Sequence, residues 1–353
     1  MRSDGLSRGL VTWRLILAAA ILFVAGASNL FVAVSSTGAQ EIKFLRIGTG
    51  STGGTYFPVG GLIANAISNP PGSMDCDLGG SCGVPGLIAA AVATQGSVEN
   101  VRAVASGELE MALTQADVAY NAHHGKGVFS DGAPLDNLRA VANLYPEAIH
   151  LVARAGLGIQ SVRDLKGKRV SVGEKSSGTR VGAQAVLKAY GLTEKNVQPF
   201  YARLGTAGDM LIEGELDAYF MVGGYPLSAI AHTADEVDIV LVPISSEAAD
   251  KIVNAQPFFV RTTIPASTYK GASDTETLSV GAQLVVSEAA DADLVYGILR
   301  AMYHPNTQKL FERGHPNAQH IGLETALDGI VIPLHPGAAR FYEEVGVAVD
   351  KAF

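Results

Sequence analysis

The chain has 353 residues, of which 48% are hydrophobic and 17% charged, so it can bury a sizeable core and divide into about two domains. Its formal net charge of −8 and isoelectric point near 5.5 argue against nucleic acid as a partner, because phosphate backbones are bound by basic surfaces and no basic stripe occurs here. The high hydrophobic content also argues against disorder.

Residues 1–39 have the pattern of a secretory signal peptide. Three arginines begin the segment, a long apolar stretch follows, and small residues precede a cleavage position near Ala39. We therefore expect the chain to be exported and leave this segment out of the fold. The alternative is an uncleaved anchor, because Leu15–Val34 approaches the ~20 residues that span a bilayer, but polar and small residues within it weaken that interpretation.

After the signal, short apolar runs alternate with segments of helical period, a pattern typical of α/β folds. Helices are predicted after most of the strands. The predicted strands are 43–48, 87–94, 110–115, 138–145, 149–154, 169–173, 197–202, 216–223, 238–244 and 277–287. Three helices have local boundary signals: Ser97 as the cap of a helix that ends before Gly107, Gly178 or Thr179 opening a helix that ends at Gly191, and Asp291 or Asp293 beginning one that stops at Pro305.

Two segments, 101–120 and 208–226, repeat one order of elements. Each reads as a helix, then Gly-Glu-Leu and an acid, then an apolar strand, then a polar or glycine-rich turn. Chance is the alternative, because Gly-Glu-Leu is a common corner between a helix and a strand, but we favour a duplicated structural role. It predicts two similar lobes that bind a ligand at the carboxyl ends of their strands, with one crossing at 143–154 and a return between Ala255 and Val286.

The segment Ile47–Phe57 contains the spacing Gly48-x-Gly50-x-x-Gly53, which dinucleotide-binding folds use. Pro58 and further glycines interrupt the expected helix, however, and no acid ends a second strand about 20 residues on. A Walker loop is also excluded, because no Gly-Lys-Ser/Thr follows. What remains is a flexible loop before a helix start, which is a general cradle for an anion.

Further polar turns are predicted after strands at 114–120, 144–150, 173–180 and 222–226. Any one of them could be ordinary turn chemistry. Ser176, Ser177 and Thr179 are more informative, because they place hydroxyls and unpaired N–H groups at one helix start. A carboxylate there would gain charge-assisted hydrogen bonds and the favourable end of the helix dipole.

Residues for catalysis or metal binding are not found together in the sequence. The eight histidines are scattered without ligand spacing, and no Gly-x-Ser-x-Gly nucleophile elbow joins a predicted strand to a predicted helix. Glu147 and His150 form the one candidate acid/base pair, but their spacing on a predicted strand puts them on opposite faces. Cys76 and Cys82 lie in a Gly/Pro-rich loop, where an exported chain is expected to form a disulfide rather than a redox or metal site.

Together, several segments resemble the TAXI-type solute-binding proteins of tripartite ATP-independent periplasmic (TRAP) transporters, a group that includes the 31 kDa immunogenic protein. The resemblance runs in order over essentially all of residues 42–348. The segments that carry it are RIGTGSTGGTYFPVGGLIANAIS, CGVPGLIAAAVATQGSVENV, TQADVAY, NLYPEAIHLVAR, VRDLKGKRVSVGE, SGT, GELDAYFMVGGYP and IPLHPGAARFYEEVG.

The resemblance implies an α/β, two-lobed periplasmic binding protein of type II, with two interlobe crossings and a central cleft that closes on its ligand. We expect residues 40–147 with about 256–353 to form the first lobe, and 148–255 the second. The protein would be a monomeric, non-enzymatic receptor without cofactor or metal. It would deliver a small carboxylate, either a glutamate-like amino acid or a dicarboxylate, to TRAP permease subunits in the membrane.

The resemblance also assigns the ligand-binding residues. Glu147 would lie at the crossing and either contact the ligand or fix the hinge. One departure concerns Lys175-Ser176, where many family members have Pro-Gly, and it puts the ligand preference in doubt. The residues implied are Thr52, Gly53, Thr55, Tyr56 and Gln115 from the first lobe, Ser177, Gly178, Thr179, Gly223, Gly224 and Tyr225 from the second, and Glu147.

Two alternatives to transport remain open at this point. The protein could present its ligand to a membrane sensor, which sequence does not distinguish from transport. It could also be an enzyme acting on small carboxylates, although this would rest on Glu147 and His150 alone.

Overall fold

The structure is a computed structural model that describes residues 41–244, 246–256 and 258–349. The predicted signal peptide, residues 1–39, lies outside these ranges. The described elements belong to one compact unit that begins at Ile42. None of the described helices combines the length and the apolar character needed to cross a bilayer.

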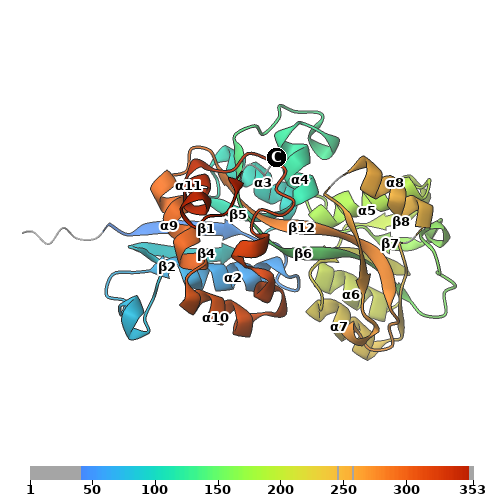
Figure 1. Cartoon of the computed structure of the whole chain (residues 1–353). Helices are drawn as coiled ribbons and strands as arrows, with labels where there is room; N and C mark the ends of the chain where they lie inside the picture. The colour runs from blue at the N-terminus through green and yellow to red at the C-terminus, as the bar shows by residue number, and fades with distance from the viewer. Residues whose placement is uncertain (1–40, 245, 257, 350–353) are drawn as a thin grey trace, which may run out of the picture. The chain divides into compact units, whose positions relative to one another are not determined.

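A single ten-stranded sheet runs through the described unit (Figure 1). Its strand order is β4-β1-β5-β12-β6-β9-β7-β8, with β10 paired to β6 and β11 paired to β12. A separate pair, β2 and β3, completes the strands described. Their bounds are β1 Lys43–Gly48, β2 Ser68–Asn69, β3 Val84–Pro85, β4 Leu87–Val92, β5 Met111–Gln115, β6 Leu138–Arg154, β7 Arg169–Ser171, β8 Gln198–Phe200, β9 Ala218–Gly223, β10 Ile239–Leu241, β11 Val260–Ile264 and β12 Thr275–Ser287.

Strand β6 is the main correction to the predicted strands. The sequence predicted two strands with a turn at 144–150, whereas the structure has one strand of 17 residues through Pro146. The proline is tolerated because β9 pairs with β6 only from Ala148 onward, so Pro146 has a strand partner on one side, Gly281 of β12. Strand β11 was not predicted.

The helices follow the strands as expected, and the bounds are α2 Tyr56–Ile67, α3 Ser97–Ser106, α4 Ala116–His123, α5 Gly178–Ala189, α6 Leu204–Ile212, α7 Ser228–Glu236, α8 Ser246–Ala255, α9 Ala292–Met302, α10 Pro305–Gly314 and α11 Pro336–Glu344. Short 3-10 segments are η1 Cys76–Leu78, η2 Gly127–Phe129, η3 Val162–Leu165, η4 Glu194–Asn196, η5 Ala266–Thr268, η6 Pro316–His320 and η7 Leu323–Thr325.

Three predicted local features have different outcomes. Asp291 caps α9 as predicted, with its side chain accepting from the N–H of Asp293. Gly178 opens α5, but the cap is Ser177. Ser97 was wrongly predicted as a cap: it is the first residue of α3, and its hydroxyl accepts from the N–H of Gln115 instead. Most of the turn predicted at 114–120 is the helix α4, which follows β5 directly.

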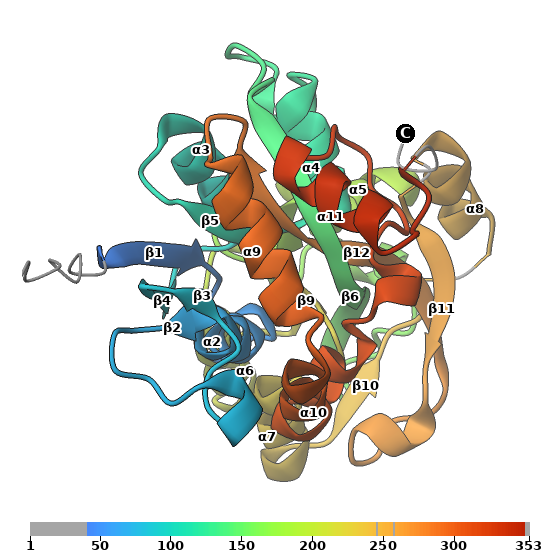
Figure 2. The same cartoon turned by 60° about the vertical axis from the view of Figure 1, so that its left-hand side comes forward.

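Strands β6 and β12 pass from one hydrophobic core to another. The first core contains Leu138–Tyr145 of β6 apart from Arg139 and Asn143, and the end of β12 from Ala282. The second contains the later part of β6, and Leu278 and Val280 of β12. The two strands pair with each other over this passage (Figure 2). The structure therefore confirms the predicted α/β, two-lobed fold with two crossings.

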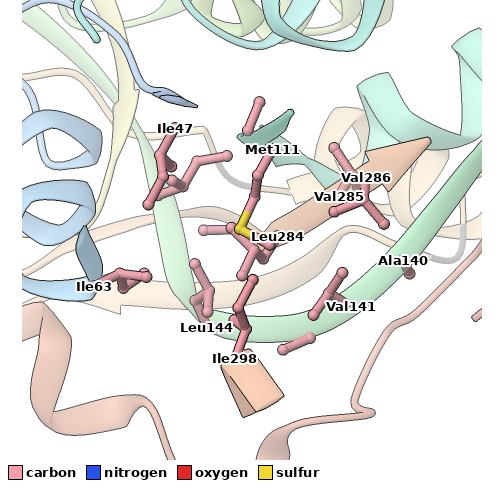
Figure 3. Packing of buried hydrophobic residues seen from close by; sticks show 14 of the residues in the cluster. Ile47, Ile63, Met111, Ala140, Val141, Leu144, Leu284, Val285, Val286 and Ile298 are labelled. Atoms are coloured by element: carbon pink, nitrogen blue, oxygen red, sulfur yellow. The ribbon is translucent and has the colours of Figure 1, made fainter. Parts of the chain in front are cut away.

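Side chains from sequence-distant strands meet in the first core. Figure 3 shows Met111 of β5 close to Leu284 of β12, with Leu144 of β6 and Ile298 of α9 on the other side of Leu284. Beyond the crossing, the sheet has a core on each face: Phe220 packs in the second core with residues of α5 and α8, and its neighbour Tyr219 packs in a third core with residues of α6 and α7. Figure 1 shows these two pairs of helices on opposite faces of the sheet. Burial on both faces explains the continuous apolar run of β9.

The order of elements predicted to repeat at 101–120 and 208–226 is present in both segments up to the end of the strand. Gly107 follows α3 and Gly214 follows α6, each with φ of +78°, a conformation that favours glycine. Leu109 and Leu216 are then buried before the strands β5 and β9. The two units differ afterwards, because β5 runs directly into α4 whereas β9 is followed by a glycine turn.

Candidate functional site

A small cavity lies where four helices begin. It is lined by Tyr56 of α2, Ser97 of α3, Gly178 of α5 and Leu204 of α6, together with residues just before these helices. It offers ≈ 60 Å³ to the centres of water-sized molecules. Because helix starts present unpaired N–H groups and positive potential, the arrangement attracts an anion without a basic side chain.

Glu147, from the crossing strand β6, lines the same cavity and is 2% exposed. Its Oε2 accepts a hydrogen bond of 2.8 Å from the hydroxyl of Tyr56. Burial raises the pKa of Glu147 to about 8, the Tyr56 hydrogen bond opposes this, and the nearby Asp117 carboxyl adds to it. Among the described residues, Oε1 of Glu147 has no hydrogen-bond partner, so it can accept from a ligand once the carboxyl has lost its proton.

Asp117 is a second buried acid, in the first turn of α4. It is 1% exposed, and its Oδ1 has no partner within the described part of the chain. Burial raises the pKa of Asp117 to about 7. Asp117 does not line the cavity, so its effect on a ligand would come through the charge of Glu147.

Three hydroxyls that the sequence assigned to the ligand are already used within the protein. Thr55 donates to the carbonyl of Gly224 at 3.0 Å. Ser177 caps α5 by accepting from the N–H of Arg180. Thr179 accepts from the N–H of Val222. The side chains shape the helix starts, and the backbone N–H groups are left as donors.

The two lobes touch directly around the cavity. The N–H of Glu99 donates to the carbonyl of Ser176 at 3.1 Å, and the N–H of Ser176 donates to Oε1 of Gln95 at 3.3 Å. Gly178 lies so close to Gln115 that a Cβ there would be 1.7 Å from Oε1 of Gln115. These contacts describe a closed arrangement, in which a larger residue at position 178 would force Gln115 or the helix to shift.

The structure places the predicted site residues in two groups. Two residues outside the cavity lining lie at the contact between the lobes: Gly224 faces Asn317, and Gly53 lies near Ala229. Thr52 is exposed. The hydroxyl of Tyr225 donates to the carbonyl of Thr263. Those that line the cavity are Thr55, Tyr56, Gln115, Glu147, Ser177, Gly178 and Thr179; those that do not are Thr52, Gly53, Gly223, Gly224 and Tyr225.

Sequence reasoning missed most of the apolar wall of the cavity and one acid. Glu174 lines the cavity and pairs with Arg203, whose side chain is 67% exposed, at 3.3 Å. The glycine-rich loop indicated Gly50, Ser51 and Gly54 as candidate site residues. The wall residues have the sequence pattern of ordinary core residues. The wall is formed by Ala202, Leu204, Ala207, Phe220, Met221 and Val222.

Glu147 and His150, the alternative catalytic pair, do not both line the cavity. His150 is 1% exposed and does not line the cavity, whereas Glu147 does. Its Nδ1 lies 3.0 Å from the carbonyl of Ala148 and its Nε2 lies 3.1 Å from the hydroxyl of Tyr269. Burial lowers the pKa of His150 to about 4, so it is neutral at pH 7 and held by the second lobe.

Cys76 and Cys82 form the predicted disulfide. The sequence gave no histidine near them, but Nε2 of His304, the cap of α10, lies 3.6 Å from Sγ of Cys76. These three residues are the one cluster of potential metal ligands in the described ranges. With both sulfurs in a disulfide and Nδ1 of His304 capping α10, the cluster is not arranged to hold a metal ion.

A two-lobed α/β unit with a cavity at its crossings has the architecture of periplasmic binding proteins. The chain belongs to the NMT1-like family, whose model matches residues 47–346. A solved structure from Bordetella bronchiseptica RB50 is similar at a TM-score of 0.50 and 15% identity, covering 86% of this chain and 98% of that one.

Two sulfonate-binding proteins also resemble the chain. The periplasmic aliphatic sulphonate binding protein SsuA from Escherichia coli is 15% identical at a TM-score of 0.44, over 85% of this chain and 83% of that one. The alkanesulfonate-binding protein SsuA from Xanthomonas axonopodis pv. citri is 14% identical at a TM-score of 0.41, over 89% and 83%. At these values the likeness says nothing about the ligand of this chain.

Proposed function

We propose that this chain is a periplasmic solute-binding receptor that captures a small organic acid by hinge closure and delivers it to a TRAP permease in the membrane. The observation that carries the proposal is the convergence of helix starts on one cavity at the crossings. Backbone donors of Tyr56, Ser97 and Gly178 would hold the carboxylate, and Glu147 would lie opposite them.

Hinge closure is supported by the two crossing strands. Contacts such as Glu99 to Ser176 and Thr55 to Gly224 join the lobes, so opening requires that they break while β6 and β12 remain. We propose the first lobe boundary near Glu147, as the sequence indicated. Because Leu278 and Val280 pack in the second core, we place the return in β12 rather than near residue 256.

Delivery to a TRAP permease rests on the sequence resemblance to TAXI-type proteins. It is tested by uptake into proteoliposomes that carry the TRAP permease of the same genome, with an ion gradient and no ATP. Uptake that depends on the receptor supports the proposal. Uptake that requires ATP and an ATP-driven permease would replace TRAP with another transporter class.

The receptor function itself is tested by thermal unfolding of residues 40–353, after unfolding and refolding to remove any carried-over ligand. A ligand at about 100 times its dissociation constant should add ~2.7 kcal/mol of stability. Small organic acids are compared with sugars as controls. A shift with one or more acids and none with sugars is expected; unchanged unfolding with every acid contradicts the proposal.

A further inference from the structure

We infer that the ligand is a small neutral amino acid, between alanine and valine in size, and not a glutamate-like acid or a dicarboxylate. The inference rests on the receptor function proposed above and narrows its ligand class. Three features of the cavity carry it: the charges that line it, its apolar wall, and its size.

The charged side chains of the cavity lining are both acidic. Among the described residues that line it, Glu147 and Glu174 carry carboxyl groups, and no lysine, arginine or histidine is present. One ligand carboxylate can be held by the N–H groups of the helix starts. A second carboxylate would have no cation to pair with and would lie near two acids, which costs binding energy.

The basic residues just outside the cavity are engaged elsewhere. Arg203 pairs with Glu174 at 3.3 Å. Arg180 pairs with Glu194 at 2.9 Å. Lys175 lies over the ring of Tyr201, 5.4 Å from its centre. None of the three lines the cavity, so none is placed to receive a second carboxylate.

The wall opposite the helix starts of α2 and α3 belongs to the second lobe and is apolar. Phe220 and Met221 come from β9, and Leu204 and Ala207 from α6. Phe220 is 2% exposed and Ala207 likewise 2%. Such a wall gains free energy from a methyl or isopropyl group and loses it when a polar group is desolvated there.

Glu147 provides the partner for an ammonium group. Glu147 lines the cavity; its Oε2 is bound by Tyr56, whereas its Oε1 has no hydrogen-bond partner among the described residues. A carboxylate this deeply buried is stabilised when a cation pairs with it. A ligand that brings both a carboxylate and an ammonium group therefore fits the helix starts and Glu147 together.

The free space limits the ligand. Only ≈ 60 Å³ is open to the centres of water-sized molecules, so a compact ligand fits it best. That volume suits an amino acid with a short side chain, and a longer side chain would have to separate the lobes at contacts such as Gln95 to Ser176.

The test is calorimetric titration of refolded residues 40–353 with alanine, valine, glutamate, succinate and 3-methyl-2-oxobutyrate, which is valine without its ammonium group. We expect alanine or valine to bind most tightly, and the other three at least about 10-fold more weakly. Tighter binding of glutamate or succinate than of both neutral amino acids overturns the inference and leaves the receptor function standing. Failure of every acid, including a wider panel, overturns the receptor function as well.

A variant pair tests the role of Glu147 separately. Glu147→Gln should weaken binding of the neutral amino acid about 10- to 100-fold and reduce its advantage over the oxo acid. The control is Glu110→Gln, which removes a carboxyl that pairs with Arg46 outside the cavity and should leave both affinities unchanged. An unchanged preference in Glu147→Gln overturns the ammonium assignment. If the Glu147→Gln variant does not fold, the ammonium assignment is still tested by the wild-type protein, which should bind valine more tightly than the oxo acid.

Discussion

The hydroxyl of Tyr56 donates a 2.8 Å hydrogen bond to Oε2 of Glu147. Tyr56 begins a helix of the first core, and Glu147 lies at the point where β6 passes to the second. The pair therefore fixes the orientation of the cavity's buried carboxyl group relative to a helix start. Changes at either residue should alter ligand binding more than changes elsewhere in α2 or β6.

Replacing Tyr56 with phenylalanine should weaken ligand binding. The change removes the hydroxyl that stabilises the Glu147 carboxylate, so the pKa of Glu147 rises further and the carboxyl is less available to an ammonium group. We expect binding about 5- to 30-fold weaker and an unfolding free energy lower by about 1 kcal/mol. Calorimetry and urea unfolding measure the two effects, and wild-type affinity in the variant would contradict the assigned role.

The affinity for an amine-bearing ligand should rise with pH. Burial raises the pKa of Glu147 to about 8, so its proton must leave when a ligand ammonium group binds the carboxylate. Between pH 6 and 8 the affinity should increase, by up to about tenfold per pH unit, and then level off. Titrations in buffers of different ionisation enthalpy should show proton release at pH 7. Affinity that falls as the pH rises through this range would exclude the mechanism.

Asp117→Asn should change how stability depends on pH. Burial raises the folded-state pKa of Asp117 to about 7, above its ordinary value of 3.8, so its favourable contribution is complete below about pH 4 and is lost as the pH rises through 7. Relative to wild type, the variant should therefore gain about 2 kcal/mol between pH 5 and pH 8. Urea unfolding of both proteins at both pH values measures the difference. The titration of His150 occurs in both proteins, so it makes no direct contribution to this difference. A constant difference would show that Asp117 does not titrate as described.

The fold was largely predictable, because apolar runs and helix boundaries are local properties of the sequence. Strand β6 was the main exception. Pro146 signals a turn locally, and whether a strand tolerates it depends on Gly281 and on where β9 begins to pair, which no neighbouring residue reveals. Strand β11 is short and largely exposed, so its pattern is weak.

The candidate site was predictable where its residues have a local signature. Glycine, serine and threonine before a helix indicated Thr55, Ser177 and Gly178. The wall residues Phe220 and Met221 carry no such signature, because a strand buried on both faces looks the same whether or not a cavity lies beside it. The contact of His304 with Cys76 joins residues 228 positions apart and depends on the packed fold.

Gly178→Ala should impair closure of the lobes. The added Cβ would lie 1.7 Å from Oε1 of Gln115, so the side chain or the helix must shift. Strain of this kind should weaken ligand binding about 10- to 100-fold while the separate cores stay folded. Small-angle scattering with saturating ligand should show a more open protein.

Gly205→Ala in α6 is the matched control, because its Cβ would meet no atom within 4 Å. It should bind ligand as the wild type does. If Gly178→Ala also behaved as the wild type in affinity and scattering, the close approach of the lobes at this point would not be needed for binding.

Removing the disulfide should affect stability and not binding. The bond closes a loop with a sequence separation of six, so its loss in the Cys76→Ser/Cys82→Ser variant should cost no more than about 2 kcal/mol. Neither cysteine lines the cavity, so the ligand affinity should stay within about twofold of wild type. Thermal unfolding and calorimetry measure the two quantities. A large loss of affinity would mean that the loop takes part in binding.

The most direct test of the account is a crystal structure of residues 40–353 with the ligand that calorimetry identifies. We expect the ligand carboxylate within hydrogen-bond distance of the backbone N–H groups at the starts of α2, α3 and α5, and the ligand nitrogen beside Oε1 of Glu147. A ligand bound outside this cavity, or one that contacts it without using the helix starts, would contradict the central claim.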